Sequence, residues 1–111
     1  MIDPTKFDAV RFEASAAAAA KLLKALANEK RLMIMCQLSG GEMTVGSLQP
    51  RVGLSQSALS QHLAVLRGDG LVATRRDGQA VHYSICDPAA AQLMTTLAAI
   101  FCPDDVETSH D

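Results

Sequence analysis

A single, mainly helical domain with one β-hairpin near its C-terminal end is predicted by three observations. Apolar residues recur at helical spacing in several segments, two β-prone segments flank an Asp-Gly dipeptide, and cap residues, glycines and prolines separate these segments. The chain has 111 residues, 49% of them hydrophobic, which suffices for one core but not for two ordinary domains. We expect an N-terminal extension over residues 1–13, the folded domain over residues 14–102 and an acidic tail over residues 103–111.

The first two helices are predicted from composition and capping. Residues 14–27, ASAAAAAKLLKALA, consist mostly of strong helix formers. Asn28 then caps a second helix, EKRLMIMCQL, which a Gly-Gly pair ends. Helical spacing in this second segment places four residues on the arc that is expected to face the core: Leu32, Met35, Cys36 and Leu38.

A helix-turn-helix follows. The segment TVGSLQPRVG begins at a Thr cap and ends at Gly53, which predicts a short third helix, although Pro50 removes one of its N–H donors. Ser55 caps the fourth helix, SQSALSQHLAVLRGDG, in which apolar residues lie at i, i+4 and i+7: Leu59, Leu63 and Leu66.

The hairpin and the last helix complete the domain. LVATR and AVHYSI are β-prone, and the Asp77-Gly78 dipeptide between them favours a tight turn. Asp87-Pro88 supplies a cap and a first-turn proline for a helix that ends at Cys102, before Pro103. Its apolar stripe is Leu93, Leu97, Ile100 and Phe101. The predicted order is ααααββα.

This order is that of a winged helix-turn-helix, in which the second helix of the pair enters the DNA major groove and the hairpin, called the wing, reaches along the backbone. Gln pairs bidentately with adenine, Ser bonds base edges or phosphates, and short side chains let a helix lie deep in the groove. The fourth helix carries such residues along one side after its cap Ser55: Gln56, Ser57, Ser60, Gln61, Ala64 and Arg67. The alternative interpretation is a merely solvated face, and the basic hairpin that follows favours DNA.

The basic charge is local. The formal net charge is −2, yet residues 51–76 hold four Arg and one Asp, whereas residues 87–111 hold five acids and no Lys or Arg. Arg75 and Arg76 of the hairpin are expected to contact phosphates or a narrow minor groove. The alternative is that their charges protect an edge strand from pairing.

Other classes of protein are disfavoured. The sequence has no Gly-rich phosphate loop, no carboxylate pair near a His and no nucleophile elbow, so we expect neither an enzyme nor a cofactor. It has no basic-then-apolar leader and no apolar run of about 18 residues, so we expect a cytoplasmic protein without a membrane partner. An interaction module that has lost DNA binding would be expected to lack Arg75, Arg76 or the short polar face.

Two stretches, ALANEKRLMIMCQL and RVGLSQSALSQHLAVLRGDGLVATRRDGQAVHYSI, resemble the ArsR/SmtB family of dimeric repressors. The resemblance extends over residues 20–102. It implies a homodimer in which the first and last helices pair across a two-fold axis, bound to an inverted repeat of double-stranded operator DNA.

Metal sensing is disfavoured within that family. Its metal sensors use a Cys-x-Cys pair before the recognition helix, or Asp and His pairs on the last helix, and neither is present. Only scattered ligands remain: Asp87, Asp104, Asp105 and His110. No metal site is assigned, and a metal-responsive repressor is kept as the alternative. His62 and His82 are interpreted as packed or hydrogen-bonded side chains.

Cys36 and Cys102 match the dithiol of the family's thiol- and persulfide-sensing branch. The resemblance implies that reactive sulfur species or an oxidant joins the two thiols, directly or through added sulfur, and thereby lowers DNA affinity. The three cysteines lack CxxC spacing and are expected to be thiols at rest. The helix end and the neighbouring acids disfavour a Cys102 thiolate, so Cys36 is expected to react first. Alternatively each thiol simply packs, which is preferred for Cys86, and the repressor has no thiol-based sensing.

Overall fold

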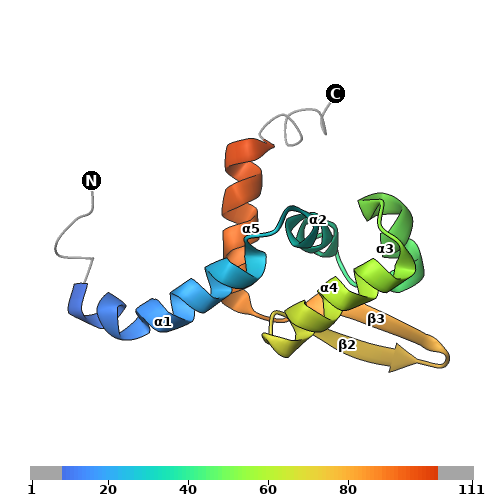
Figure 1. Cartoon of the computed structure of the whole chain (residues 1–111), viewed down its shortest axis with the longest axis horizontal. Helices are drawn as coiled ribbons and strands as arrows, with labels where there is room; N and C mark the ends of the chain where they lie inside the picture. Colours follow the sequence, from blue (N-terminus) through green and yellow to red (C-terminus); the bar gives the residue numbers. More distant parts are fainter. Residues whose placement is uncertain (1–8, 103–111) are drawn as a thin grey trace.

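The computed structural model describes residues 9–102. These residues form five helices and three strands (Figure 1). The elements are α1 (Ala9–Leu26), α2 (Glu29–Leu38), β1 (Met43–Thr44), α3 (Val45–Val52), α4 (Gln56–Gly68), β2 (Val72–Asp77), β3 (Ala80–Ile85) and α5 (Pro88–Phe101). The predicted winged helix-turn-helix is confirmed, with β1 as an addition to the predicted order. No helix among the described residues is long and apolar enough to cross a membrane.

The first helix is longer than predicted. It starts at Ala9 rather than at residue 14 and ends at Leu26, because no Gly or Pro interrupts the segment AVRFE before the Ala-rich run. Part of the predicted N-terminal extension is therefore helical. Residues 1–8 and the predicted acidic tail, residues 103–111, lie outside the described residues.

The predicted caps hold the helix starts. The Asn28 side chain accepts hydrogen bonds from the backbone N–H groups of Lys30 (2.9 Å) and Arg31 (3.1 Å). The Ser55 hydroxyl accepts one from Ala58 at 3.2 Å, and a carboxylate oxygen of Asp87 accepts one from Ala90 at 3.1 Å. Caps of this kind each stabilise a helix by about 1 kcal/mol.

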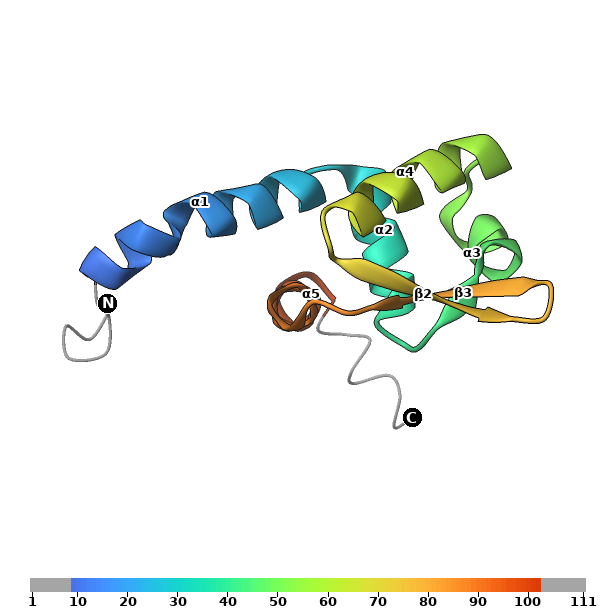
Figure 2. The ribbon, with the colours of Figure 1, turned by 90° about the horizontal axis from the view of Figure 1, so that it is seen from below.

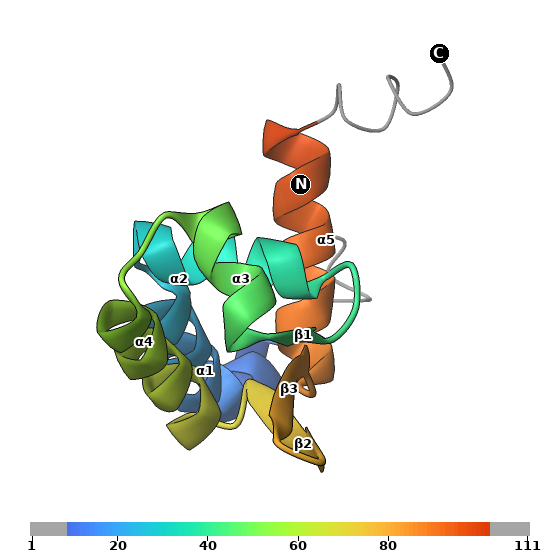
Figure 3. The same cartoon turned by 90° about the vertical axis from the view of Figure 1, so that its right-hand side faces the viewer.

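The turn between α3 and α4 depends on Gly53. Its φ of 67° lies in the left-handed region, where a side chain is disfavoured, and its N–H bonds the carbonyl of Gln49 at 3.1 Å. Pro50 lies inside α3 without breaking it. Ser55, two residues after Gly53, caps the start of α4. Because the chain reverses direction at Gly53, α4 packs against α3 (Figure 3).

The wing hairpin, β2 and β3, is joined by β1 in a three-stranded antiparallel sheet in the order β1-β3-β2. The turn lies one residue later than predicted: Asp77 pairs with Ala80, so Gly78 and Gln79 form the two-residue loop. Gly78 has a φ of 63° and Gln79 does not share a positive φ, as in a type II′ turn. The unpredicted strand β1 pairs Met43 with Tyr83.

The core lies between α2, α3, α4, the sheet and the first turns of α5. Its fully buried large side chains are Ile34, Met35, Leu48, Val52, Leu59, Leu63 and Leu66. The predicted inward arc of α2 is wrong in one respect, because Cys36 is exposed and Ile34 is buried. On α5 the buried residues are Ala90 and Met94, whereas Ile100 and Phe101 are exposed.

The elements divide between two ends of the molecule. Figures 1 and 2 both show α1 running away from the helix-turn-helix, and the hairpin tip and the N-terminal end of α4 at the opposite end. α5 stands across the domain and contacts α2. The elements expected to read DNA are thus distant from the projecting half of α1.

Candidate nucleic-acid interface and thiol site

The polar face predicted for α4 is exposed. The three leucines at i, i+4 and i+7 have no accessible surface, and they anchor α4 to the core. All six residues predicted on the opposite side are exposed: Gln56, Ser57, Ser60, Gln61, Ala64 and Arg67. Ser55 is also exposed, but its hydroxyl is engaged in capping α4. The arrangement leaves a polar, sterically open helix face with donors and acceptors suited to base edges.

The wing carries its two arginines on a strand at the edge of the sheet. Arg75 pairs with His82 and Arg76 with Val81 in the register of β2 and β3. Successive residues of a strand point to opposite faces, so the two guanidinium groups are directed differently. Both residues are exposed. An edge position also fits the alternative of strand protection, since β2 has an unpaired side.

Arg75 is held by a carboxylate that sequence analysis missed. Its Nε donates to Oε2 of Glu42 at 3.3 Å, and its Nη2 donates to Oε1 of the same side chain. The Arg75 Nη1 lies 4.0 Å from Oδ2 of Asp77, and the His82 Nδ1 lies 3.9 Å from Oε1 of Glu42. Glu42 precedes β1, and pairing of β1 with β3 brings it beside the wing.

This contact shifts both ionisation equilibria toward the charged forms. The hydrogen bond from Arg75, aided by the attraction of its charge and that of His82, lowers the pKa of the Glu42 carboxyl below its ordinary value of 4.5. The hydrogen bond to Glu42 raises the pKa of Arg75. The pair is therefore ionised at neutral pH. Because both groups are exposed to solvent, the ion pair adds little to the stability of the fold.

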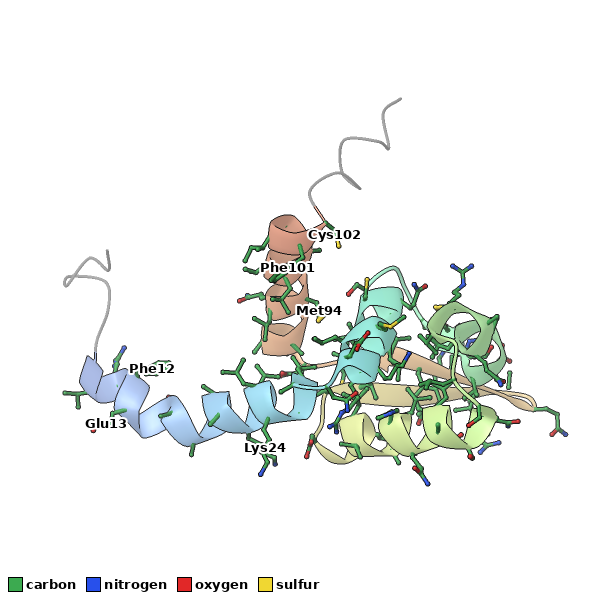
Figure 4. All side chains as sticks on the ribbon, turned by 45° about the horizontal axis from the view of Figure 1, so that its top comes forward. Phe12, Glu13, Lys24, Met94, Phe101 and Cys102 are labelled. Carbon is green, nitrogen blue, oxygen red and sulfur yellow. The ribbon has the colours of Figure 1, made fainter. Side chains whose placement is uncertain are left out.

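The three cysteines are free thiols and exposed. The prediction that Cys86 packs in the interior is therefore wrong. The Cys86 Sγ instead donates a hydrogen bond to the carbonyl of Gly70 at 3.4 Å. Cys102 caps the end of α5 through its N–H, which bonds the carbonyl of Ala98, and Figure 4 places it beside Phe101 at that end. Cys36 lies on α2, the helix that α5 contacts.

Cys36 opens into a surface hollow of about 420 Å³ between α2, the β1 segment and α3. Besides Cys36, its lining includes Arg51 from α3 and Glu42. Sequence analysis did not place Arg51 at this hollow, where Glu42 supplies the opposite charge. Arg51 could not be assigned from sequence because it belongs to the following helix and carries no motif.

Neither of the two histidines among residues 9–102 belongs to a group of potential metal ligands. His62 is half-buried on α4, and His82 is half-buried on β3 near Glu42. Within residues 9–102, no group of three or more His, Cys, Asp or Glu side chains is placed to hold a metal ion. Asp87, one of the scattered ligands considered above, is used to cap α5. Asp104, Asp105 and His110 lie outside the described residues.

Large apolar side chains are exposed mainly on α1 and α5. Phe101 is 75% exposed and Ile100 is 61% exposed on α5, and α1 exposes Val10, Phe12 and Leu23. Figure 4 shows Phe12 on the projecting end of α1 and Phe101 near the end of α5. Exposure of several large apolar side chains on two helices of one small domain is unfavourable in water and is typical of a protein–protein interface.

The fold and the exposed polar face of α4 are those of the winged helix-turn-helix class of DNA-binding proteins. Comparison with known proteins gives the family. The model of the arsR family of bacterial regulatory proteins matches residues 28–74. The transcriptional activator HlyU of Vibrio cholerae serotype O1 is 49% identical over 90 residues, which are 81% of this chain and 83% of that protein. The chain belongs to the ArsR family.

Solved structures agree with this assignment. Reduced HlyU from Vibrio cholerae has a TM-score of 0.79 and 48% identity, over 83% of this chain and 97% of that one. The transcriptional repressor BigR from Xylella fastidiosa has a TM-score of 0.82 and 42% identity, over 86% of this chain and 98% of that one. HlyU is named as a transcriptional activator and BigR as a transcriptional repressor.

Proposed function

We propose that this chain is a homodimeric repressor that binds an inverted repeat of double-stranded DNA in the cytoplasm. The observation that carries the proposal is the exposed polar face of α4, which three buried leucines on its other side fix to the core. In the proposed complex base edges and nearby phosphates meet the residues predicted from the sequence: Ser55, Gln56, Ser57, Ser60, Gln61 and Arg67. Arg75 and Arg76 hold the backbone.

The dimer is proposed to form through α1 and α5. Its support is the exposure of Phe101, Ile100 and the apolar residues of α1, which burial against a second copy would remove from water. A two-fold pair presents two copies of α4, which suits half-sites about one helical turn apart. Binding of the parent chain to double-stranded fragments selected from a random pool tests this proposal, and recovery of sequences without an inverted repeat would contradict it.

The proposed inducer is a reactive sulfur species or an oxidant that acts on Cys36 and Cys102. Support comes from the accessibility of both thiols and from the contact between the helices that carry them. The outer sulfur of a persulfide passes to Cys36, and the donor leaves as a thiol. A disulfide or polysulfide then accepts the two electrons and two protons given up when Cys102 closes the bridge, and it leaves as thiols.

Bridging ties α2 to the end of α5 and so changes the relative positions of the two reading helices. The reduced protein should therefore bind the operator and release it after treatment with a persulfide donor and a disulfide. Cys36→Ser and Cys102→Ser should each stay bound, whereas Cys86→Ser, the matched control, should respond like the parent. Normal release by either of the first two variants, or loss of the response in Cys86→Ser, would contradict the dithiol assignment.

A metal-responsive repressor is the second candidate. It would require ligands outside the described residues or ligands shared between two copies, since residues 9–102 of one chain contain no cluster of potential ligands. Operator release by a divalent metal ion from the double variant Cys36→Ser/Cys102→Ser would favour it.

A further inference from the structure

We propose that Glu42 competes with the DNA backbone for Arg75 and thereby sets how strongly the wing holds DNA. The inference rests on the proposed contact between Arg75 and phosphates. It adds a positioning residue, Glu42, which lies outside the helix-turn-helix and the hairpin and which acts through Arg75.

The geometry of the contact makes it competitive. A guanidinium binds a carboxylate or a phosphate through the same pairs of parallel N–H groups. The Nε and Nη2 edge of Arg75 is already taken by both oxygens of Glu42, and its Nη1 is nearest to Asp77. A phosphate that binds this edge must therefore displace Glu42.

Charge points the same way. Around Arg75, the two carboxylates of Glu42 and Asp77 outnumber the single guanidinium, so the intact cluster carries a net negative charge. A phosphate approaching it meets repulsion until Glu42 withdraws. His82, the remaining titratable group near Glu42, adds positive charge only when it is protonated. Arg76, by contrast, forms no ion pair within the described part of the chain and is available to DNA at once.

Both partners are placed so that exchange is feasible. The side chain of Arg75 is 54% exposed and that of Glu42 is 37% exposed, so neither is locked in the core. An exposed ion pair of this kind is weak, so the free energy lost when it breaks can be offset by a new contact between Arg75 and a phosphate. We infer that Arg75 is shared between a held state and a DNA-bound state, and that Glu42 determines the balance.

The test uses a fluorescently labelled duplex of mixed sequence, because a phosphate contact does not require the operator. Binding of the parent, Glu42→Gln, Arg75→Ala and the double variant is measured by anisotropy at several NaCl concentrations. Glu42→Gln should bind about two- to fivefold more tightly per protomer. Its log–log salt dependence should steepen by up to about one per protomer, because Arg75 neutralises a phosphate in a larger share of the complexes. Arg75→Ala should therefore cost more affinity in the Glu42→Gln background than in the parent.

Asp77→Asn is the matched control, since it removes the same charge from the cluster without freeing the bidentate edge. It should strengthen binding less than Glu42→Gln does. Equal effects of the two variants, an unchanged salt slope in Glu42→Gln, or the same gain in an Arg75→Ala background would overturn the inference. If Arg75→Ala weakens binding and Glu42→Gln changes nothing, only the role of Glu42 fails. If the parent binds no DNA, both the inference and the proposed function fail.

Discussion

The substitution Gln61→Ala tests the proposed reading face directly. Gln61 is exposed in the middle of α4, on the side opposite the buried Leu63, and it makes no hydrogen bond within the described residues. Alanine is also a good helix former, so the thermal midpoint of the free protein should not fall. Any loss of DNA affinity can then be assigned to the missing contact with DNA.

The size of that loss follows from the expected contact. A bidentate pair between Gln and adenine discriminates by about 1–3 kcal/mol, so each half-site should lose about 5- to 150-fold in affinity. Only the binding of specific sequence should suffer, because Gln61 carries no charge for the phosphates. Affinity for an unrelated duplex serves as the internal control and should stay constant.

The assay is an anisotropy titration against the DNA selected by the parent, followed by the same titration on variants of that DNA with one base pair changed. The parent should discriminate strongly at one position of each half-site, and Gln61→Ala should lose that discrimination. An unchanged affinity and an unchanged base preference would refute base reading by Gln61. The same result for Gln56, Ser57 and Ser60 would refute the whole face.

Four further substitutions test other parts of the argument. Arg76→Ala should weaken binding to specific and unrelated DNA alike and lower the salt slope by about one per protomer, and a loss confined to one base position would indicate base reading instead. Leu63→Ala, at a fully buried position, should lower the free energy of unfolding by about 2–5 kcal/mol in a urea titration, and a change of less than about 1 kcal/mol would contradict its place in the core. Phe101→Ser should shift sedimentation toward the monomer without lowering helix content, whereas an unchanged dimer would place the interface elsewhere. The hydrogen bond from Arg75 lowers the pKa of Glu42, so the stabilisation by Glu42 should be present above about pH 4.5 and vanish as the pH falls through the folded-state pKa. The difference in Tm between the parent and Glu42→Gln should shrink over that range. Loss of the difference already between pH 7 and about pH 5 would be inconsistent with the lowered pKa.

The sequence by itself determined the order of the helices and the hairpin. Asn28, Ser55 and Asp87 were predicted as caps, and each accepts hydrogen bonds from the first turn of its helix. The polar face of α4 and its opposite row of leucines were also predicted. These features depend on residues within about four positions of one another, so the periodicity and the cap chemistry of the local sequence are enough to specify them.

Features that depend on how the elements pack were decided only by the tertiary structure. The sequence spacing placed Cys36 on an inward arc of α2, but the arc that faces the core is set by α3, α4 and α5, and it contains Ile34 instead. The strand β1 has two residues, too few to show a period, and it exists because β3 pairs with it. Pairing of β1 with β3 brings Glu42 to Arg75, 33 residues further along the chain. The local sequence of either segment could not predict this ion pair, because the two charges come together only in the folded sheet.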